Sequence, residues 1–136
     1  TTTIIIHNAN MPLVKIKNIE ECIKKCHEEV IVTTVAKCNG FFYQKCDNMK
    51  LSIGPDRDNI FHAKVPEAMK LSMASELYND QIFNEKKYES YTAGMLGIIK
   101  NKEVEFSVCD STNMKITTKE DYELVETYLK NEKKGE

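Results

Sequence analysis

The sequence predicts an α/β fold in which helices pack against a mostly parallel β-sheet and a β-hairpin arm projects from the body. The main observation is a β-branched run at 2–7, a helical pattern after it, and a second β-branched run at 30–35. Strand, helix and strand over about 35 residues is typical of a βαβ unit, whose two strands run in the same direction.

The arm is predicted by a second observation. Two short segments rich in apolar residues, 40–46 and 49–53, flank an Asp-Asn pair at 47–48. This pattern is typical of a hairpin, although Asp-Asn is a weaker turn signal than Asn-Gly. An isolated hairpin is marginally stable, so its apolar side chains need cover, which a partner subunit would supply. With 136 residues we expect one domain over 1–136, with the arm at about 40–54.

The first helix is expected to begin after Asn18, a favourable N-cap residue, with Glu20 and Glu21 in its first turn. Apolar residues at helical spacing predict the face that packs on the sheet. They are Ile19, Cys22, Ile23, Cys26 and Val30.

Further helices are expected after the arm. Residues 59–64 are expected to be extended, and Pro66 to open a helix that runs from 66 to about 78. The polar stretch 79–88 predicts a loop. A short helix over about 91–100 follows, with Thr92 near its start.

The C-terminal region predicts a strand at 104–108, a turn, a short strand that contains Lys115, and a final helix over about 119–131. Thr118 is the expected helix cap, with negative charge in the first turn from Glu120 and Asp121. The expected buried stripe of this helix is Tyr122, Val125 and Leu129.

Lys115 is the first candidate for a functional residue. A lysine beside the N-terminus of a helix suits an anionic ligand such as a phosphate, because the helix end offers unpaired N–H groups and positive potential. The alternative is an ordinary strand-to-helix joint with a solvated lysine.

Composition narrows the classes of function. A net charge of −2 offers no basic surface for nucleic acid. No apolar run reaches membrane-spanning length, and no secretory signal is present. The five cysteines contain no Cys-x-x-Cys pair, so we expect no zinc site but reduced thiols in an intracellular, cytoplasmic protein.

Four local patterns follow one another along the chain. They are Ile6–Val14, Asp56–Ala68, Tyr91–Gly94 and Asn113–Asp121. Together they resemble the C-terminal part of the sugar-alcohol-phosphate cytidylyltransferases, which include the 2-C-methyl-D-erythritol 4-phosphate enzyme and its ribitol-5-phosphate relatives. The last pattern is the most specific, because the family's usual form is Asn-Ile-Lys-Val/Ile-Thr-Thr-Pro-Glu-Asp. The resemblance runs through nearly all of the chain, and it implies part of a nucleotidyltransferase fold with a Rossmann-like sheet.

The resemblance implies transfer of a cytidylyl group from CTP to a sugar phosphate, with release of pyrophosphate and with Mg²⁺ as the metal. Lys115 matches the family's lysine near the reacting phosphates, where a cation offsets negative charge. Thr92 matches a threonine at the substrate phosphate. Arg57 matches an arginine that, in family dimers, reaches from the base of the arm into the neighbour's substrate site. A homodimer through the arm is thus implied, whereas nothing in the chain itself supports a Mg²⁺ site.

Several positions depart from the family pattern. His7 and Pro12 match the flanks of a His-Asp-Ala-x-Arg-Pro motif whose aspartate anchors the substrate's hydroxyls. That aspartate is Asn8 here, and the motif's arginine is Met11, which cannot grip a phosphate. The family's threonine before the proline is Val65, and the acid after Thr92 is Ala93.

Structural interpretations compete for three of these residues. Arg57 lies between Asp56 and Asp58, so a local surface ion pair is an alternative to substrate binding. Thr92 is equally expected as a plain helix cap, and His7 as a hydrogen-bonded structural histidine.

The family's glycine-rich loop, which holds the CTP phosphates, has no counterpart among the five scattered glycines. We therefore expect this chain alone to be inactive. Two hypotheses stay open: a piece of a cytidylyltransferase whose nucleotide-binding half lies elsewhere, or a non-catalytic module that dimerises through the arm or binds a phosphorylated ligand.

Overall fold

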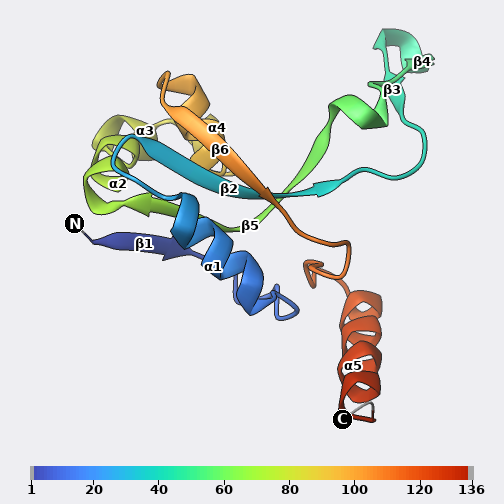
Figure 1. Cartoon of the computed structure of the whole chain (residues 1–136). Helices are drawn as coiled ribbons and strands as arrows, with labels where there is room; N and C mark the ends of the chain where they lie inside the picture. The colour runs from blue at the N-terminus through green and yellow to red at the C-terminus, as the bar shows by residue number, and fades with distance from the viewer. Residues whose placement is uncertain (1, 135–136) are drawn as a thin grey trace.

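The computed structural model describes residues 2–134, without the side chains of positions 80 and 83, and a four-stranded sheet in the order β1-β5-β2-β6 forms its centre (Figure 1). The strands are β1 (Thr3–Ile6), β2 (Val30–Lys37), β5 (Phe61–Lys70) and β6 (Glu103–Val108). β5 pairs antiparallel with β1 and with β2, while β6 pairs parallel with β2. The predicted α/β class with flanking helices is confirmed, and the sheet is mixed because β5 runs against the other three strands.

The predicted strand–helix–strand unit is present, with one difference. β1 and β2 run in the same direction and are joined through α1 (Ile16–Lys25), but β5 lies between them in the sheet. The sequence pattern therefore predicted the relative direction of β1 and β2 correctly but not the strand between them, because β5, which follows β2 in the chain, fills that position.

Helix α1 starts earlier than expected. Its N-cap residue is Lys15, which makes no side-chain cap hydrogen bond, and Asn18 lies inside the helix with only 3% of its surface exposed. Cys22 is fully buried, whereas Ile23 is 48% exposed. The face that packs on the sheet is therefore the one shared by Asn18, Cys22 and Cys26, which are spaced four residues apart.

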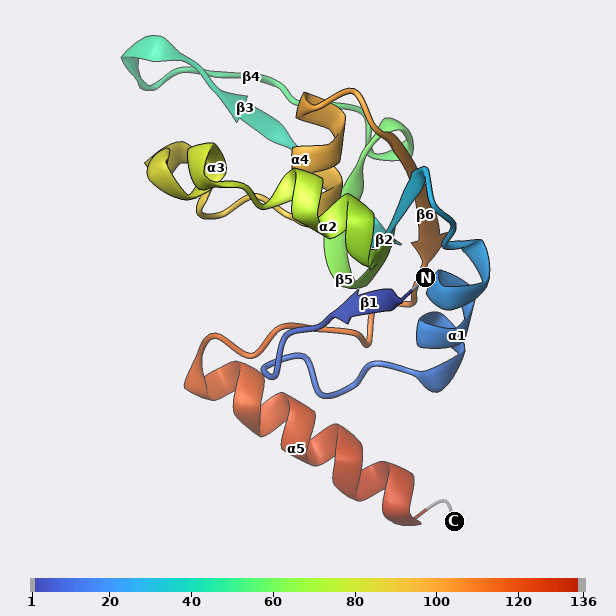
Figure 2. The ribbon, with the colours of Figure 1, turned by 90° about the vertical axis from the view of Figure 1, so that its left-hand side faces the viewer.

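Two apolar layers hold the helices to the sheet, and Figure 2 shows α1 on one side and α2 (Leu71–Leu77) with α4 (Ala93–Ile99) on the other. The layer under α1 contains Cys22, Cys26, Val30, Val32 and Ala68. The layer under α2 and α4 contains Ile31, Met69, Met73, Leu77, Ala93 and Leu96. Neighbouring residues of one strand enter opposite layers, as the two-residue period of a strand requires.

The helix predicted from Pro66 is wrong at its start. β5 continues through Pro66 to Lys70, and α2 begins only at Leu71. Ala68 and Met69 are fully buried between the neighbouring strands, so strand pairing overrides the helix signal of the proline. The β2–β5 ladder shifts register between Val32 and Thr34, and such irregularities are where a sheet tolerates proline.

The stretch predicted as a loop contains two short helical segments instead. These are α3 (Asp80–Asn84) and a 3₁₀ turn at Lys86–Tyr88. The Asn79 side chain accepts a hydrogen bond from the Ile82 amide at 3.2 Å, which caps α3. A favourable cap residue thus starts a helix in a polar sequence that offers no apolar periodicity.

The predicted hairpin arm is confirmed. β3 (Tyr43–Lys45) and β4 (Leu51–Ile53) pair antiparallel and project away from the sheet (Figure 1). Asn48 and Met49 close the turn with positive φ angles of 68° and 61°. Phe41 and Ile53 are each 91% exposed, so this chain does not cover the arm's apolar residues.

Helix α5 (Lys119–Lys134) forms where expected and is longer than predicted. The segment before it, 113–117, is not assigned as a strand. Thr118 caps the helix as predicted: its hydroxyl accepts from the Asp121 amide at 3.1 Å. Only Val125 of the expected stripe is buried, since Tyr122 is 56% and Leu129 39% exposed. None of the helices formed by the described residues is long and apolar enough to cross a membrane.

Candidate functional site

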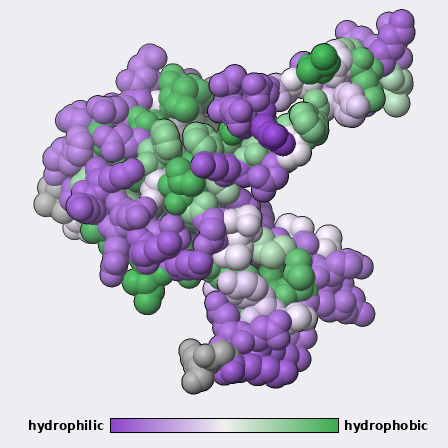
Figure 3. Space-filling model, turned by 45° about the vertical axis from the view of Figure 1, so that its right-hand side comes forward, coloured by the Kyte–Doolittle hydropathy of each residue, from purple (hydrophilic) through white to green (hydrophobic). Residues whose placement is uncertain are grey.

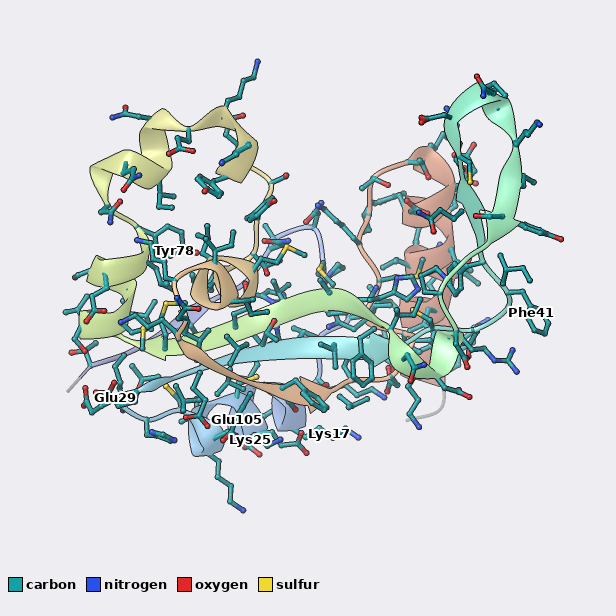
Figure 4. All side chains as sticks on the ribbon, turned by 90° about the horizontal axis from the view of Figure 1, so that it is seen from above. Lys17, Lys25, Glu29, Phe41, Tyr78 and Glu105 are labelled. Carbon is teal, nitrogen blue, oxygen red and sulfur yellow. The ribbon has the colours of Figure 1, made fainter. Side chains whose placement is uncertain are left out.

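A cavity of about 450 Å³ lies beyond the C-terminal end of β1, between β5, the start of α4 and the segment 113–117. The residues that matter for its chemistry are Asn8, Met11, Lys64, Glu67, Thr92 and Lys115. Tyr78 also lines the cavity, and Figure 4 shows it on the face of the sheet opposite Lys17 and Lys25 of α1. Ligands of α/β sheets commonly bind beyond the carboxyl ends of strands, which is where this cavity lies.

Three of the four predicted site residues come together in this cavity. Asn8 follows β1, Thr92 precedes α4, and Lys115 lies in the segment after β6, so three distant parts of the chain contribute one residue each. The fourth, Arg57, lies at the base of the arm, where its guanidinium is 5.0 Å from the centre of the Phe41 ring. Within residues 2–134 Arg57 forms no ion pair, so the local ion pair considered as an alternative does not form. The functional roles of all four stay predictions.

Thr92 both caps a helix and faces the cavity. Its Oγ1 accepts a hydrogen bond from the Met95 amide at 3.1 Å, as expected for an N-cap. A hydroxyl group also carries one hydrogen that it can donate. Thr92 can therefore keep its structural bond and still donate a hydrogen bond to a ligand oxygen.

Glu67 is a site residue that sequence reasoning missed. Its carboxylate accepts hydrogen bonds from the amides of Ala93 at 3.0 Å and Gly94 at 2.9 Å, and the residue is only 3% exposed. It thereby satisfies the first N–H groups of α4, which a bound anion would otherwise use. An acidic residue within the apolar run 65–69 was the available signal, but the expected helix at Pro66 hid its significance.

Two hydrogen bonds hold the loop after β1 at the position where the resemblance places a phosphate-binding arginine. The Met11 amide donates to the Asn8 carbonyl at 3.0 Å, and His7 Nε2 donates to the Met11 carbonyl at 2.9 Å. The Met11 side chain is 3% exposed. The structural interpretation of His7 is thus the one that its contacts support, and Met11 contributes apolar surface and no charge.

Lys115 is held at the cavity by the residues around it. Asn113 is 2% exposed and donates from Nδ2 to the Val65 carbonyl at 2.8 Å. On the other side, the Ile116 amide donates to the Asn10 carbonyl at 2.8 Å, and Asn10 Nδ2 donates to the Ile116 carbonyl at 3.1 Å. These bonds fix the backbone on both sides of Lys115 and leave its side chain exposed.

Glu67 also affects its neighbour Tyr78. Burial, together with the charge of Glu67, raises the pKa of the Tyr78 phenol. The phenol is therefore neutral over the physiological range and adds no charge to the cavity.

The cavity does not offer a built site for the Mg²⁺ that the resemblance implies. Among the side chains that the structure describes, no three His, Cys, Asp or Glu residues are grouped closely enough to hold a metal ion. Of the two carboxylates at the cavity, Glu67 is taken up by backbone amides and Glu89 is exposed. Mg²⁺ prefers carboxylates that are free to bind it, usually together with substrate phosphates, and we therefore derive no step through a metal.

Sequence comparison finds similar proteins at low identity. The chain is 26% identical over 132 residues to the 2-C-methyl-D-erythritol 4-phosphate cytidylyltransferase of Alkaliphilus oremlandii. The aligned residues cover 97% of this chain and 55% of that protein. It is 20% identical over 126 residues to the ribitol-5-phosphate cytidylyltransferase of Streptococcus pneumoniae, with 93% and 53% covered. The chain thus spans about half the length of the curated relatives it matches. No protein-family profile matches it.

Solved structures agree on the fold. The 4-diphosphocytidyl-2C-methyl-D-erythritol synthase of Anaerococcus prevotii superposes with a TM-score of 0.74 at 20% identity, over 94% of this chain and 58% of that one. The 2-C-methyl-D-erythritol 4-phosphate cytidylyltransferase of Francisella tularensis gives 0.74 at 21% identity. The chain therefore resembles the sugar-alcohol-phosphate cytidylyltransferases in sequence and shares the α/β fold of these structures over nearly all of its length.

Proposed function

We propose that the cavity is the sugar-phosphate side of a cytidylyltransferase-like centre and binds a small phosphorylated sugar alcohol. The observation that carries this proposal is the convergence of Asn8, Thr92 and Lys115 on one cavity. Each was singled out from a different sequence pattern, and the resemblance assigns each to substrate or to the reacting phosphates.

The side chains of the cavity suit different groups of such a ligand. Lys115 offsets the charge of a phosphate, and Thr92 donates a hydrogen bond to it. The Asn8 amide offers donors and an acceptor to the ligand's hydroxyl groups, without the charge of the family's aspartate. A cavity of about 450 Å³ is within the usual range for a small-molecule site.

We further propose that residues 1–136 alone do not transfer a nucleotidyl group. The cavity is uncharged at Met11, where the resemblance expects an arginine, and each such loss costs on the order of 2–4 kcal/mol at a transition state. The chain also has no glycine-rich loop to hold the phosphates of CTP. A phosphate-ligand module is thus the role that this chain supports by itself.

Binding and turnover are tested separately. Calorimetry with ribitol 5-phosphate and with 2-C-methyl-D-erythritol 4-phosphate should show binding of at least one, and Lys115→Met should weaken it. Absence of binding by both ligands would overturn the proposal. A pyrophosphate-release assay with CTP, Mg²⁺ and the same ligands should give no product, and measurable release would overturn the inactivity of the chain alone.

A second role, self-association through the arm, is favoured by a separate observation. Five apolar side chains of the arm are largely exposed, and a group of exposed apolar side chains is typical of an interaction surface. They are Phe41, Tyr43, Met49, Leu51 and Ile53. We propose that a second copy of the chain covers them, which would bring Arg57 at the base of the arm close to the neighbouring subunit. Sedimentation as a monomer at micromolar concentration would contradict this.

A further inference from the structure

We propose that Lys64 is a second phosphate-binding residue, which acts with Lys115 in the same cavity and supplies the positive charge that Met11 lacks. This inference rests on the proposed function, because it concerns the same cavity and the same class of ligand. It adds a residue that no sequence pattern singled out.

The first support is that neither lysine has an ion-pair or hydrogen-bond partner for its side chain among the described residues. Within residues 2–134, neither Lys64 nor Lys115 forms an ion pair or a side-chain hydrogen bond, although both line the cavity. Other lysines do have partners: Lys15 pairs with Asp110, and Lys102 with Glu76. Two cations without partners in one cavity repel each other, and an anion bound between them removes that cost.

The carboxylates of the cavity do not neutralise these lysines. Glu67 uses one oxygen for the Ala93 amide and the other for the Gly94 amide, so its charge is directed to the start of α4. Glu89 lies on the exposed margin. The positive charge is therefore available to a ligand that enters from solvent.

The second support is the course of β5. In a regular strand, residues three apart point to opposite faces, so Lys64 and Glu67 would not share a cavity. The register shift of the β2–β5 ladder between Val32 and Thr34 falls opposite this stretch, since Thr34 pairs with Lys64 and Val32 with Ala68. Such irregularities redirect side chains, and here Lys64 and Glu67 both line the cavity.

The arrangement also predicts which anions fit. Two ammonium groups and the Thr92 hydroxyl suit the oxygens of one phosphate group. Glu67 lies in the same cavity and adds no positive group, so these cations and this hydroxyl suffice for one phosphate and not for two. The ligand class is therefore a small phosphomonoester, and not a nucleoside di- or triphosphate.

The test measures binding of two probes, inorganic phosphate and ribitol 5-phosphate, to the full chain by NMR titration of backbone amides. The variants are Lys64→Met, which keeps the apolar stem and removes the charge, and Lys64→Arg, which keeps the charge. Lys17→Met is the matched control, because Lys17 is exposed on α1 and lies on the opposite face of the sheet (Figure 4). The amide spectrum of each variant reports in the same experiment whether the fold is kept.

We expect Lys64→Met to raise the dissociation constant of both probes by about tenfold or more, with Lys64→Arg within about threefold and Lys17→Met within about twofold of the wild type. Inorganic pyrophosphate should bind no more tightly than inorganic phosphate. If Lys115→Met weakens binding and Lys64→Met does not, the inference is wrong and the proposed function stands. If the wild-type chain binds neither probe, the inference is wrong, and the proposed function is wrong as well if 2-C-methyl-D-erythritol 4-phosphate also fails to bind.

Discussion

The cavity and the arm differ in how far contacts within this chain stabilise them. At the cavity, hydrogen bonds of Glu67 and Asn113 tie separate parts of the chain together, and Thr92 caps the helix that begins there. The arm has a two-stranded ladder, and its large apolar side chains are exposed, as the green residues of the projecting hairpin in Figure 3 show.

This difference separates two kinds of functional surface. The cavity is positioned by bonds within one chain, so its geometry exists before any ligand arrives. The arm has large apolar side chains that the described residues leave exposed, and this is the surface that we propose a second copy covers. Changes at the cavity should therefore act on folding or ligand binding in the single chain, whereas changes at the arm should act on association.

The largest effect is expected from Glu67→Ala. This change leaves the amides of Ala93 and Gly94 without partners at a buried helix start, so the free energy of unfolding should fall by about 2–4 kcal/mol. Urea denaturation measures this loss. Glu89→Ala, at the exposed margin of the same cavity, is the control and should change stability by less than about 0.5 kcal/mol. Equal effects of the two would mean that Glu67 does not hold α4 to β5.

The arm should respond in the opposite way. The double change Phe41→Ser and Ile53→Thr removes two side chains that are each 91% exposed, so it should cost the single chain little stability. It should weaken self-association by about 100-fold, because apolar anchors carry most of the energy of an interface. Sedimentation over a concentration series measures this. Ile16→Thr, at a 73% exposed position outside the arm, is the control and should leave the dimer intact. A wild-type chain that is already monomeric would remove the basis of the comparison.

The two regions also differ in how far the sequence predicts them. The arm is a local structure, and its hairpin follows from residues within 40–54. The cavity depends on pairing between distant segments, and there the local signal fails. Pro66 favours a helix start, but the pairing of Ala68 with both neighbouring strands and of Met69 with β1 extends β5 through it. Lys64 and Glu67 were missed for the same reason, since their role depends on the register shift opposite them.

Helix α5 combines features of both regions. Local hydrogen bonds fix its start, as at the cavity, and several of its apolar side chains are exposed, as on the arm. The Thr118 hydroxyl accepts from the Asp121 amide, and the Asp121 carboxylate accepts from the amides of Thr117 and Thr118, each at 3.0 Å. Thr118→Ala should lower the free energy of unfolding by about 1 kcal/mol. Circular dichroism during urea denaturation measures this. Thr127→Ala, in the middle of the same helix, is the control, and an equal loss there would contradict a specific capping role.

The smallest effect is expected where a surface ion pair joins the loop before α1 to the turn after β6. Hydrogen bonds from Lys15 and Thr112 lower the pKa of Asp110 to about 2, from an ordinary value of 3.8. A carboxyl group whose pKa is lower in the folded protein than in the unfolded chain stabilises the fold. This stabilisation is complete at pH values above the unfolded-chain pKa and is lost as the pH falls through the folded-state pKa. The difference in unfolding free energy between wild type and Asp110→Asn should thus be constant above about pH 5 and shrink between about pH 4 and 2.

Because the Asp110 side chain is 41% exposed, water and salt screen the pair, and the difference should be smaller than that of Thr118→Ala. A difference that grows as the pH falls from 5 to 2 would show that Asp110 is held in its protonated form, which the donated hydrogen bonds at both of its oxygens oppose.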